Sequence, residues 1–195
     1  SATAQAQEIN FGIIATDTAS TQRERWEPFF RDMEKKTGLK VKSFYAPDYA
    51  GVIEAQRFNK VQVAWYGNKA AMEAVDRANS EIFAQIVYSG GSLGYYSLLI
   101  VHKDSPIQSL DDIIRNFVLN YGKSDPREKE VLKNIYNYSG FRESTNAQLI
   151  PIRQLEFYKD RVKIEGDTAL NAEEKQKKLA EIDARLMELD RQARR

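Results

Sequence analysis

Short apolar runs and helix-like patterns alternate over the first half of the chain. Five runs have the length of a β-strand: residues 9–15, 39–45, 61–65, 82–87 and 95–101. Between the first two runs, the spacing i, i+3, i+4, i+7 predicts a helix with an apolar face made of Trp26, Phe29, Phe30 and Met33. Gly38 is expected to end that helix, and two more helices are expected to begin near Asp48 and Asn68.

This alternation predicts an α/β fold, because helices that connect neighbouring strands form βαβ units. We expect a mostly parallel five-stranded sheet with helices on both faces. Ligands of such sheets bind at the carboxyl ends of the strands. The loops at that edge hold Thr16, residues 46–49 and residues 66–68. Each loop leads into a helix N-terminus, which favours an anion.

The pattern changes to helices alone after residue 102. Helices are expected over residues 110–122, 126–138, 152–162 and 172–192, and the only further strand considered is 148–150. We therefore predict an α/β lobe over residues 1–122 and a helical extension over residues 123–195. The extension is expected to pack on the lobe or on a partner chain.

Composition and charge exclude several classes of function. The 29 basic and 28 acidic side chains give a net charge of +1, so no bulk attraction to nucleic acid is expected. The chain has no cysteine and a single histidine, His102, which argues against a metal site. No run approaches the ~20 apolar residues of a membrane span, and the sequence holds no glycine-rich phosphate loop or nucleophile motif. We expect no enzyme activity, no cofactor and no metal.

Several longer motifs resemble a known family. They are FYAPDYAG at residues 44–51, RFNKV at 57–61, AWYGN at 64–68, AMEAVDRAN at 71–79 and GYYS at 94–97. These motifs resemble the amino-terminal lobe of bacterial phosphonate-binding proteins, the type II periplasmic receptors of ABC importers. The resemblance runs over residues 8–114 and resumes over residues 117–122 and 149–155. It implies a single periplasmic-binding-protein lobe of flavodoxin-like α/β type and a periplasmic location.

In the family, a second α/β lobe is inserted at the position that corresponds to Arg115 and Asn116. In this chain these two residues follow one another directly. The apolar spacing across that join predicts one continuous helix through Ile113, Ile114, Phe117 and Val118. The resemblance therefore implies a lobe without its partner lobe. The place of the join favours removal by design; natural deletion, or omission of residues of a longer protein, are the alternatives.

The resemblance also implies a ligand and the residues that contact it. Tyr49 would donate its hydroxyl to a phosphonate oxygen, and Tyr95 would form a wall of the cleft. Tyr66 and Thr16 are weaker candidates, and Tyr66 is equally compatible with core packing. Because the rest of the family's site lies on the second lobe, we expect weak or undetectable phosphonate binding, of a 2-aminoethylphosphonate-like ligand.

The last predicted helix bears on possible partners. Its apolar seam has the spacing three, four, three and consists of Leu179, Ile182, Leu186 and Leu189. Such a seam fits packing on the chain's own domain or a contact between two copies. The family docks on an ABC permease, and its members resemble dimers joined through carboxyl-terminal helices, so a homodimer is expected. A self-associating structural module without ligand binding is the alternative function.

Overall fold

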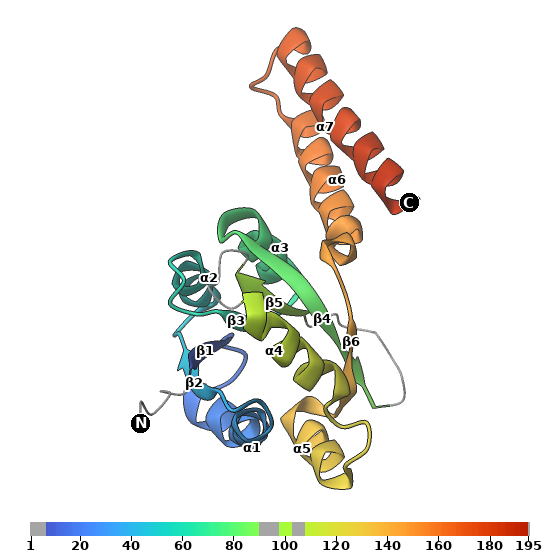
Figure 1. Ribbon diagram of the computed structural model, residues 1–195. Coiled ribbons are helices and arrows are strands. Elements are labelled where there is room, and N and C mark those ends of the chain that lie inside the picture. The colour runs from blue at the N-terminus through green and yellow to red at the C-terminus, as the bar shows by residue number, and fades with distance from the viewer. Residues whose placement is uncertain (1–6, 90–97, 103–107, 195) are drawn as a thin grey trace. The chain divides into compact units, whose positions relative to one another are not determined.

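The computed structural model describes residues 7–89, 98–102 and 108–194, and the chain divides into two compact units, Ser1–Thr145 and Asn146–Arg195. The first unit is an α/β lobe (Figure 1). Its elements are, in chain order, β1 (Glu8–Ile13), α1 (Ala19–Thr37), β2 (Lys40–Tyr45), α2 (Tyr49–Arg57), β3 (Val63–Tyr66), α3 (Asn68–Arg77), β4 (Ser80–Tyr88), β5 (Leu98–His102), α4 (Gln108–Asn120), α5 (Pro126–Tyr136) and β6 (Tyr138–Glu143). The second unit consists of η1 (Asn146–Leu149), α6 (Ile150–Gly166) and α7 (Ala172–Ala193).

The six-stranded sheet has the order β2-β1-β3-β5-β4-β6. β1 runs parallel to β2 and β3, whereas β5 is antiparallel to β3 and β4, and β6 is antiparallel to β4. The α/β class is confirmed, but the prediction of five mostly parallel strands is wrong. Only residues 89–97 separate β4 from β5, which is too short for the crossover that a parallel pair needs.

β6 is the strand that the sequence did not reveal. Asn137 ends α5 in the left-handed conformation, at φ 57°, and the strand then begins one residue later. The burial of β6 follows no period of two, because Gly140 lies inside it at φ 159° and the pairing with β4 shifts register there. Residues 148–150, the only further strand considered, belong instead to η1 and the start of α6.

The helices cover opposite faces of the sheet. Phe11 of β1 packs on the rings of Trp26 and Phe30 in α1, whereas the next residue, Gly12, lies against Val52 of α2. Successive residues of a strand point to opposite faces, so α1 and α2 lie on different sides. α4 contacts α1, and α3 contacts α2, which completes one helical layer on each face.

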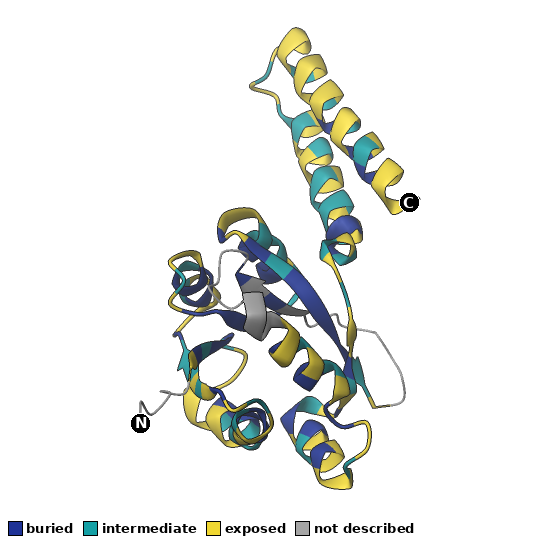
Figure 2. Ribbon diagram, in the orientation of Figure 1, coloured by how far each residue is buried: buried dark blue, intermediate teal, exposed yellow. Residues whose placement is uncertain are grey.

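Phe29 lies at the centre of the core beneath α1. Its ring meets six other aromatic rings at centroid distances of 4.9–6.3 Å; they belong to Phe11, Trp26, Phe30, Phe117, Tyr121 and Phe141. The last three come from α4, from the turn that follows it and from β6, in the part of the chain beyond residue 115. Buried residues of the first unit gather in the strands and on the sheet-facing sides of its helices (Figure 2).

Two buried carboxylates fasten the segment after α4 to the lobe. Asp32 of α1 accepts hydrogen bonds from the Tyr121 hydroxyl and, at 2.5 Å, from Arg127 Nη2. Glu128 of α5 is 1% exposed and accepts a 2.9 Å hydrogen bond from the backbone N–H of Gly122. Burial, with the hydrogen bond to Asp32, raises the pKa of Tyr121, so its hydroxyl remains a proton donor.

These contacts place the domain boundary later than the sequence predicted. α5 and β6 belong to the first unit, which ends at Thr145 and not at residue 122. α4 is one continuous helix across residues 115 and 116, as the apolar spacing predicted. The reason for the error is that a strand paired only with a distant segment leaves no local signal in the sequence.

The second unit is a hairpin of α6 and α7. The seam of α7 is largely buried within this hairpin, at Ile182, Leu186 and Leu189. Two polar contacts join the helices: Arg161 Nε donates to Asp183 Oδ1 at 3.0 Å, and Gln154 Nε2 donates to Asp190 Oδ1 at 2.6 Å. The seam therefore packs against α6 of the same chain, which was one of the two alternatives, and it gives no support to a homodimer.

Candidate functional site: an aromatic cavity at the carboxyl edge of the sheet

A cavity of about 440 Å³ lies at the edge of the sheet where β1, β3 and β4 end. Its described lining comes from the loops after these strands, from the start of α2, and from the junction of α5 and β6. The lining residues are Ile14, Thr16, Tyr49, Trp65, Gly67, Tyr88, Tyr136 and Tyr138. The loops that the sequence assigned to a ligand-binding edge thus meet at one cavity.

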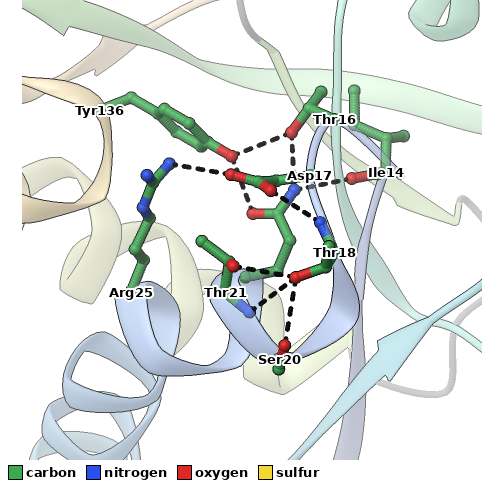
Figure 3. A network of polar contacts seen from close by, with 9 residues as sticks. Ile14, Thr16, Asp17, Thr18, Ser20, Thr21, Arg25 and Tyr136 are labelled. Carbon is green, nitrogen blue, oxygen red and sulfur yellow. Dashed lines mark hydrogen bonds and ion pairs between the residues drawn. The ribbon is translucent and has the colours of Figure 1, made fainter.

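Thr16 and Tyr136 belong to a hydrogen-bond ring beside this cavity (Figure 3). The amide of Gln22 closes the ring and fixes its direction. Its Nε2 donates to the carbonyl of Ile14 at 3.1 Å and to Thr16 Oγ1 at 2.6 Å. A carbonyl can only accept, so the other amide atom, Oε1, must be the one that accepts the Tyr136 hydroxyl proton at 3.0 Å. The Thr16 hydroxyl lies 3.0 Å from the Tyr136 hydroxyl and must donate to it.

This closed ring has a chemical consequence for the site. Thr16 and Tyr136 each have one hydroxyl proton, and both protons are used inside the ring. Neither hydroxyl can donate to an anionic ligand unless the ring opens. Thr16, one of the four candidates, lines the cavity, and its hydroxyl is engaged with Gln22 and Tyr136.

Arg25 approaches the same tyrosine from α1. Its guanidinium carbon lies 4.8 Å from the centroid of the Tyr136 ring, and its Nη1 lies 3.6 Å from Asp17 Oδ2. The Tyr136 ring also stacks on Trp65, with centroids 5.6 Å apart and planes inclined by 17°. A cation–π contact and a stacked pair therefore hold this ring in place.

The predicted tyrosines lie in different environments. Tyr49 lines the cavity at the start of α2 and is 43% exposed, and no hydrogen bond joins its hydroxyl to another described residue. Tyr66 is 0% exposed and donates to Gln56 Oε1 at 3.1 Å on the α2 side of the sheet. The prediction that Tyr66 contacts ligand is not supported by this position, since strand alternation brings its neighbour Trp65 to the cavity instead. Tyr95 lies outside the described residues.

Four aromatic residues of the cavity were not among the candidates: Trp65, Tyr88, Tyr136 and Tyr138. Trp65 lies in β3, and its place at the cavity follows from the face of the sheet to which it points. Tyr136 and Tyr138 belong to the part predicted as a helical extension, so nothing in the local pattern connected them with Thr16. A weak signal existed in the two aromatic residues that flank Asn137, a residue that often ends helices.

The cavity has little charge. None of its described lining residues is acidic or basic, and burial raises the pKa of the neighbouring Tyr66, which keeps that hydroxyl protonated. Among the residues that the structure describes, no three potential metal ligands gather in one place. The described walls are mostly aromatic, and the half-exposed Tyr49 adds a hydroxyl that makes no hydrogen bond with a described residue.

A sequence model of one protein family matches residues 11–115, which is more than half of the chain. That family is the phosphonate ABC transporter's periplasmic substrate-binding protein. This chain belongs to it. The segment matched by the phosphonate-receptor family runs from β1 into α4 and includes Thr16, Tyr49, Trp65 and Tyr88, but it ends before Tyr136.

Individual members of the family show how much of a receptor is present. The phosphonates-binding periplasmic protein of Escherichia coli (strain K12) is 48% identical over 153 residues, which are 73% of this chain and 45% of that protein. The phosphate-import protein PhnD of Mycolicibacterium smegmatis is 33% identical over 98 residues, or 49% of this chain and 30% of that protein. The chain therefore spans less than half of the length of either relative.

Solved structures agree with the fold. A crystal structure of a binding protein component of an ABC phosphonate transporter from Pseudomonas aeruginosa matches with a TM-score of 0.91 at 28% identity, covering 96% of this chain and 98% of that chain. A methylphosphonate complex from Prochlorococcus marinus matches with a TM-score of 0.63 at 10% identity over 76% of this chain and 97% of that chain, which shows the fold alone. None of the described helices has the length and apolar character needed to cross a membrane.

Proposed function

We propose that this chain is the first lobe of a phosphonate receptor of an ABC importer and that it keeps one side of the ligand cleft. The observation that carries the proposal is the position of the cavity. It lies at the carboxyl edge of the sheet, where α/β folds bind ligands. Most of its lining falls in the segment that the family model matches, and Tyr49 brings to it a hydroxyl that no described residue engages in a hydrogen bond.

We further propose that the second lobe was removed at residues 115 and 116. Two observations support this. The chain corresponds to 45% of the Escherichia coli protein, and α4 passes through those residues as one helix. β6 and α5, which follow the join, pack into the lobe by pairing with β4 and by contacts with α1. A lobe assembled from segments on both sides of the join needs no second lobe for its core.

A lone lobe is expected to bind phosphonate weakly. The Tyr49 hydroxyl is half-exposed, and each hydrogen bond made in water contributes only about 0.5–1.5 kcal/mol. No basic side chain lines the described cavity to balance the charge of the anion. Affinity in the millimolar range or weaker corresponds to about −4 kcal/mol or less. Because one lobe cannot close on a ligand, we also expect little or no contribution to import through a permease.

Substituting Tyr49 by Phe is expected to weaken binding of 2-aminoethylphosphonate by about 2–10-fold, since it removes one water-exposed hydrogen bond. Titrations followed by NMR shifts of residues lining the cavity measure both affinities, and inorganic phosphate serves as a second ligand. Tyr158→Phe is the matched control, because Tyr158 is exposed on α6 and lies outside the cavity.

Two results would contradict the proposal. Submillimolar saturation by 2-aminoethylphosphonate would show that the single lobe binds more strongly than one exposed hydroxyl allows. Equal affinities of the wild-type chain and the Tyr49→Phe variant would remove Tyr49 from the site. The control variant Tyr158→Phe should bind 2-aminoethylphosphonate as the wild-type chain does.

The alternative function, a self-associating structural module, has no supporting observation. The apolar seam of α7 is buried at Ile182, Leu186 and Leu189 against α6. It is therefore unavailable to a second copy unless the hairpin opens. We do not propose the homodimer as part of the function.

A further inference from the structure

The walls of the cavity are preformed by pairs of aromatic rings. Trp65 stacks on Tyr136, and Tyr88 meets Tyr138 edge-to-face, with centroids 5.3 Å apart and planes at 78°. The ring centroids of Tyr136 and Tyr138 lie 5.9 Å apart, so the two pairs contact each other. Rings that are already held by one another lose little freedom when a ligand enters, so the cost of ordering the site is small.

The walls offer a ligand inside the cavity only neutral hydrogen-bond donors, such as the buried indole N–H of Trp65, which has no partner among the described residues. The protons of Thr16 and Tyr136 are used in the ring with Gln22. An anionic group that left water for this space would lose its hydration without gaining charged partners, which is costly. The anion is therefore better placed outside, beside the exposed hydroxyl of Tyr49.

A positively charged group gains little there either. A cation needs an open aromatic face, but the Tyr136 ring already carries the Arg25 guanidinium at 4.8 Å from its centroid. Trp65 is contacted by Tyr136 and by Trp26, whose ring centroid lies 5.5 Å away. The positive charge of Arg25 also repels a second cation at this tyrosine. An ammonium group thus gains little from the rings of Trp65 and Tyr136.

We propose that the cavity is a subsite for a neutral apolar substituent of the ligand, and that it prefers an aromatic ring to a methyl group. This inference rests on the proposed function, because it assigns the carbon-bound group of the same phosphonate. A volume of about 440 Å³ accommodates an aromatic ring and lies in the usual range of small-molecule sites. Apolar area buried against the ring walls supplies the preference.

The test compares phenylphosphonate with methylphosphonate in titrations followed by the indole N–H resonance of Trp65, which lines the cavity. Phenylphosphonate is expected to bind about tenfold more tightly or better, from the additional apolar area that it buries. 2-Aminoethylphosphonate is expected to show no comparable gain over methylphosphonate. Tyr88→Ala, which removes one ring from the wall at the end of β4, should reduce the preference for phenylphosphonate several-fold.

Phe58→Ala is the matched control, since Phe58 is an exposed aromatic residue that does not line the cavity; it should leave the preference intact. Equal affinities for the phenyl and methyl compounds would overturn the inference while leaving the proposed function in place. Benzyl alcohol, which has an aromatic ring but no phosphonate group, distinguishes failure of the subsite from failure of phosphonate recognition. If it shifts the Trp65 resonance while neither phosphonate binds, the subsite stands and phosphonate recognition fails. If neither benzyl alcohol nor phenylphosphonate shifts that resonance, the subsite is wrong.

Discussion

Replacing Phe29 by Ala is expected to lower the free energy of unfolding of the first unit by about 3–5 kcal/mol, the usual loss for a fully buried phenylalanine. Phe29 is 0% exposed, and its ring contacts α4 and β6 as well as β1 and its own helix. The loss combines the transfer of a large apolar side chain with the cavity left among rigid aromatic neighbours. Domains of this size are stable by about 5–15 kcal/mol, so the variant would be marginally folded.

Urea denaturation followed by circular dichroism measures this loss, with Phe58→Ala as the control. Phe58 is 66% exposed, so its removal should change the stability by no more than about 0.5 kcal/mol. Similar small losses for both variants would mean that the segments on the two sides of the join do not share one core. The comparison therefore tests the central structural claim, that the chain beyond residue 115 completes the lobe.

Gly122→Ala is the second substitution with a large expected effect, about 2–5 kcal/mol of destabilisation. Gly122 follows the end of α4 at φ 79°, where an L-residue costs about 1–2 kcal/mol. A Cβ at this position would also collide with the buried Cδ1 of Leu132 in α5. Relieving that overlap by moving α5 adds the cost of an overpacked core, about 1–3 kcal/mol.

Gly38→Ala separates the two causes. Gly38 ends α1 at φ 73°, but a Cβ there would meet nothing within 4 Å. It should therefore show only the backbone cost, about 1–2 kcal/mol. The same denaturation experiment compares the variants. Equal losses at the two glycines would indicate that Leu132 does not lie against Gly122, and that α5 docks elsewhere. In a Leu132→Ala background, Gly122→Ala should cost less than in the wild-type chain, because the collision is gone.

The Phe29 and Gly122 variants both test whether the segments before and after residue 115 form one core. Residues on both sides of the join build one sheet and one aromatic core, and the cavity has walls from both. Tyr136 and Tyr138 follow the join, whereas Thr16, Tyr49 and Trp65 precede it. A ligand that binds here thus depends on the docking of α5 and β6, and mutations that loosen this docking should weaken binding as well as stability.

Local sequence signals determined the elements whose causes are local. Thr18 caps α1 by accepting from the N–H of Thr21, and Gly38 ends the same helix in the left-handed conformation. Asp48 caps α2 in the same way, with Gly51 as donor. The apolar face from Trp26 to Met33 is buried as its spacing predicted. These features depend on residues within about one helical turn of each other, so the sequence alone sufficed.

The tertiary structure decided what depends on segments far apart in the chain. The direction of β5 and the existence of β6 follow from pairing with β4, which no local pattern encodes. Because successive residues of β3 point to opposite faces of the sheet, Trp65 lines the cavity and Tyr66 does not. Thr16 and Tyr136 are 120 positions apart in the sequence, yet their hydroxyls form a hydrogen bond. Because Thr16 donates its only hydroxyl proton to Tyr136, that proton is not available to a ligand. The residue types of the site were visible in the sequence, but their roles depend on which distant partners the packing brings to them.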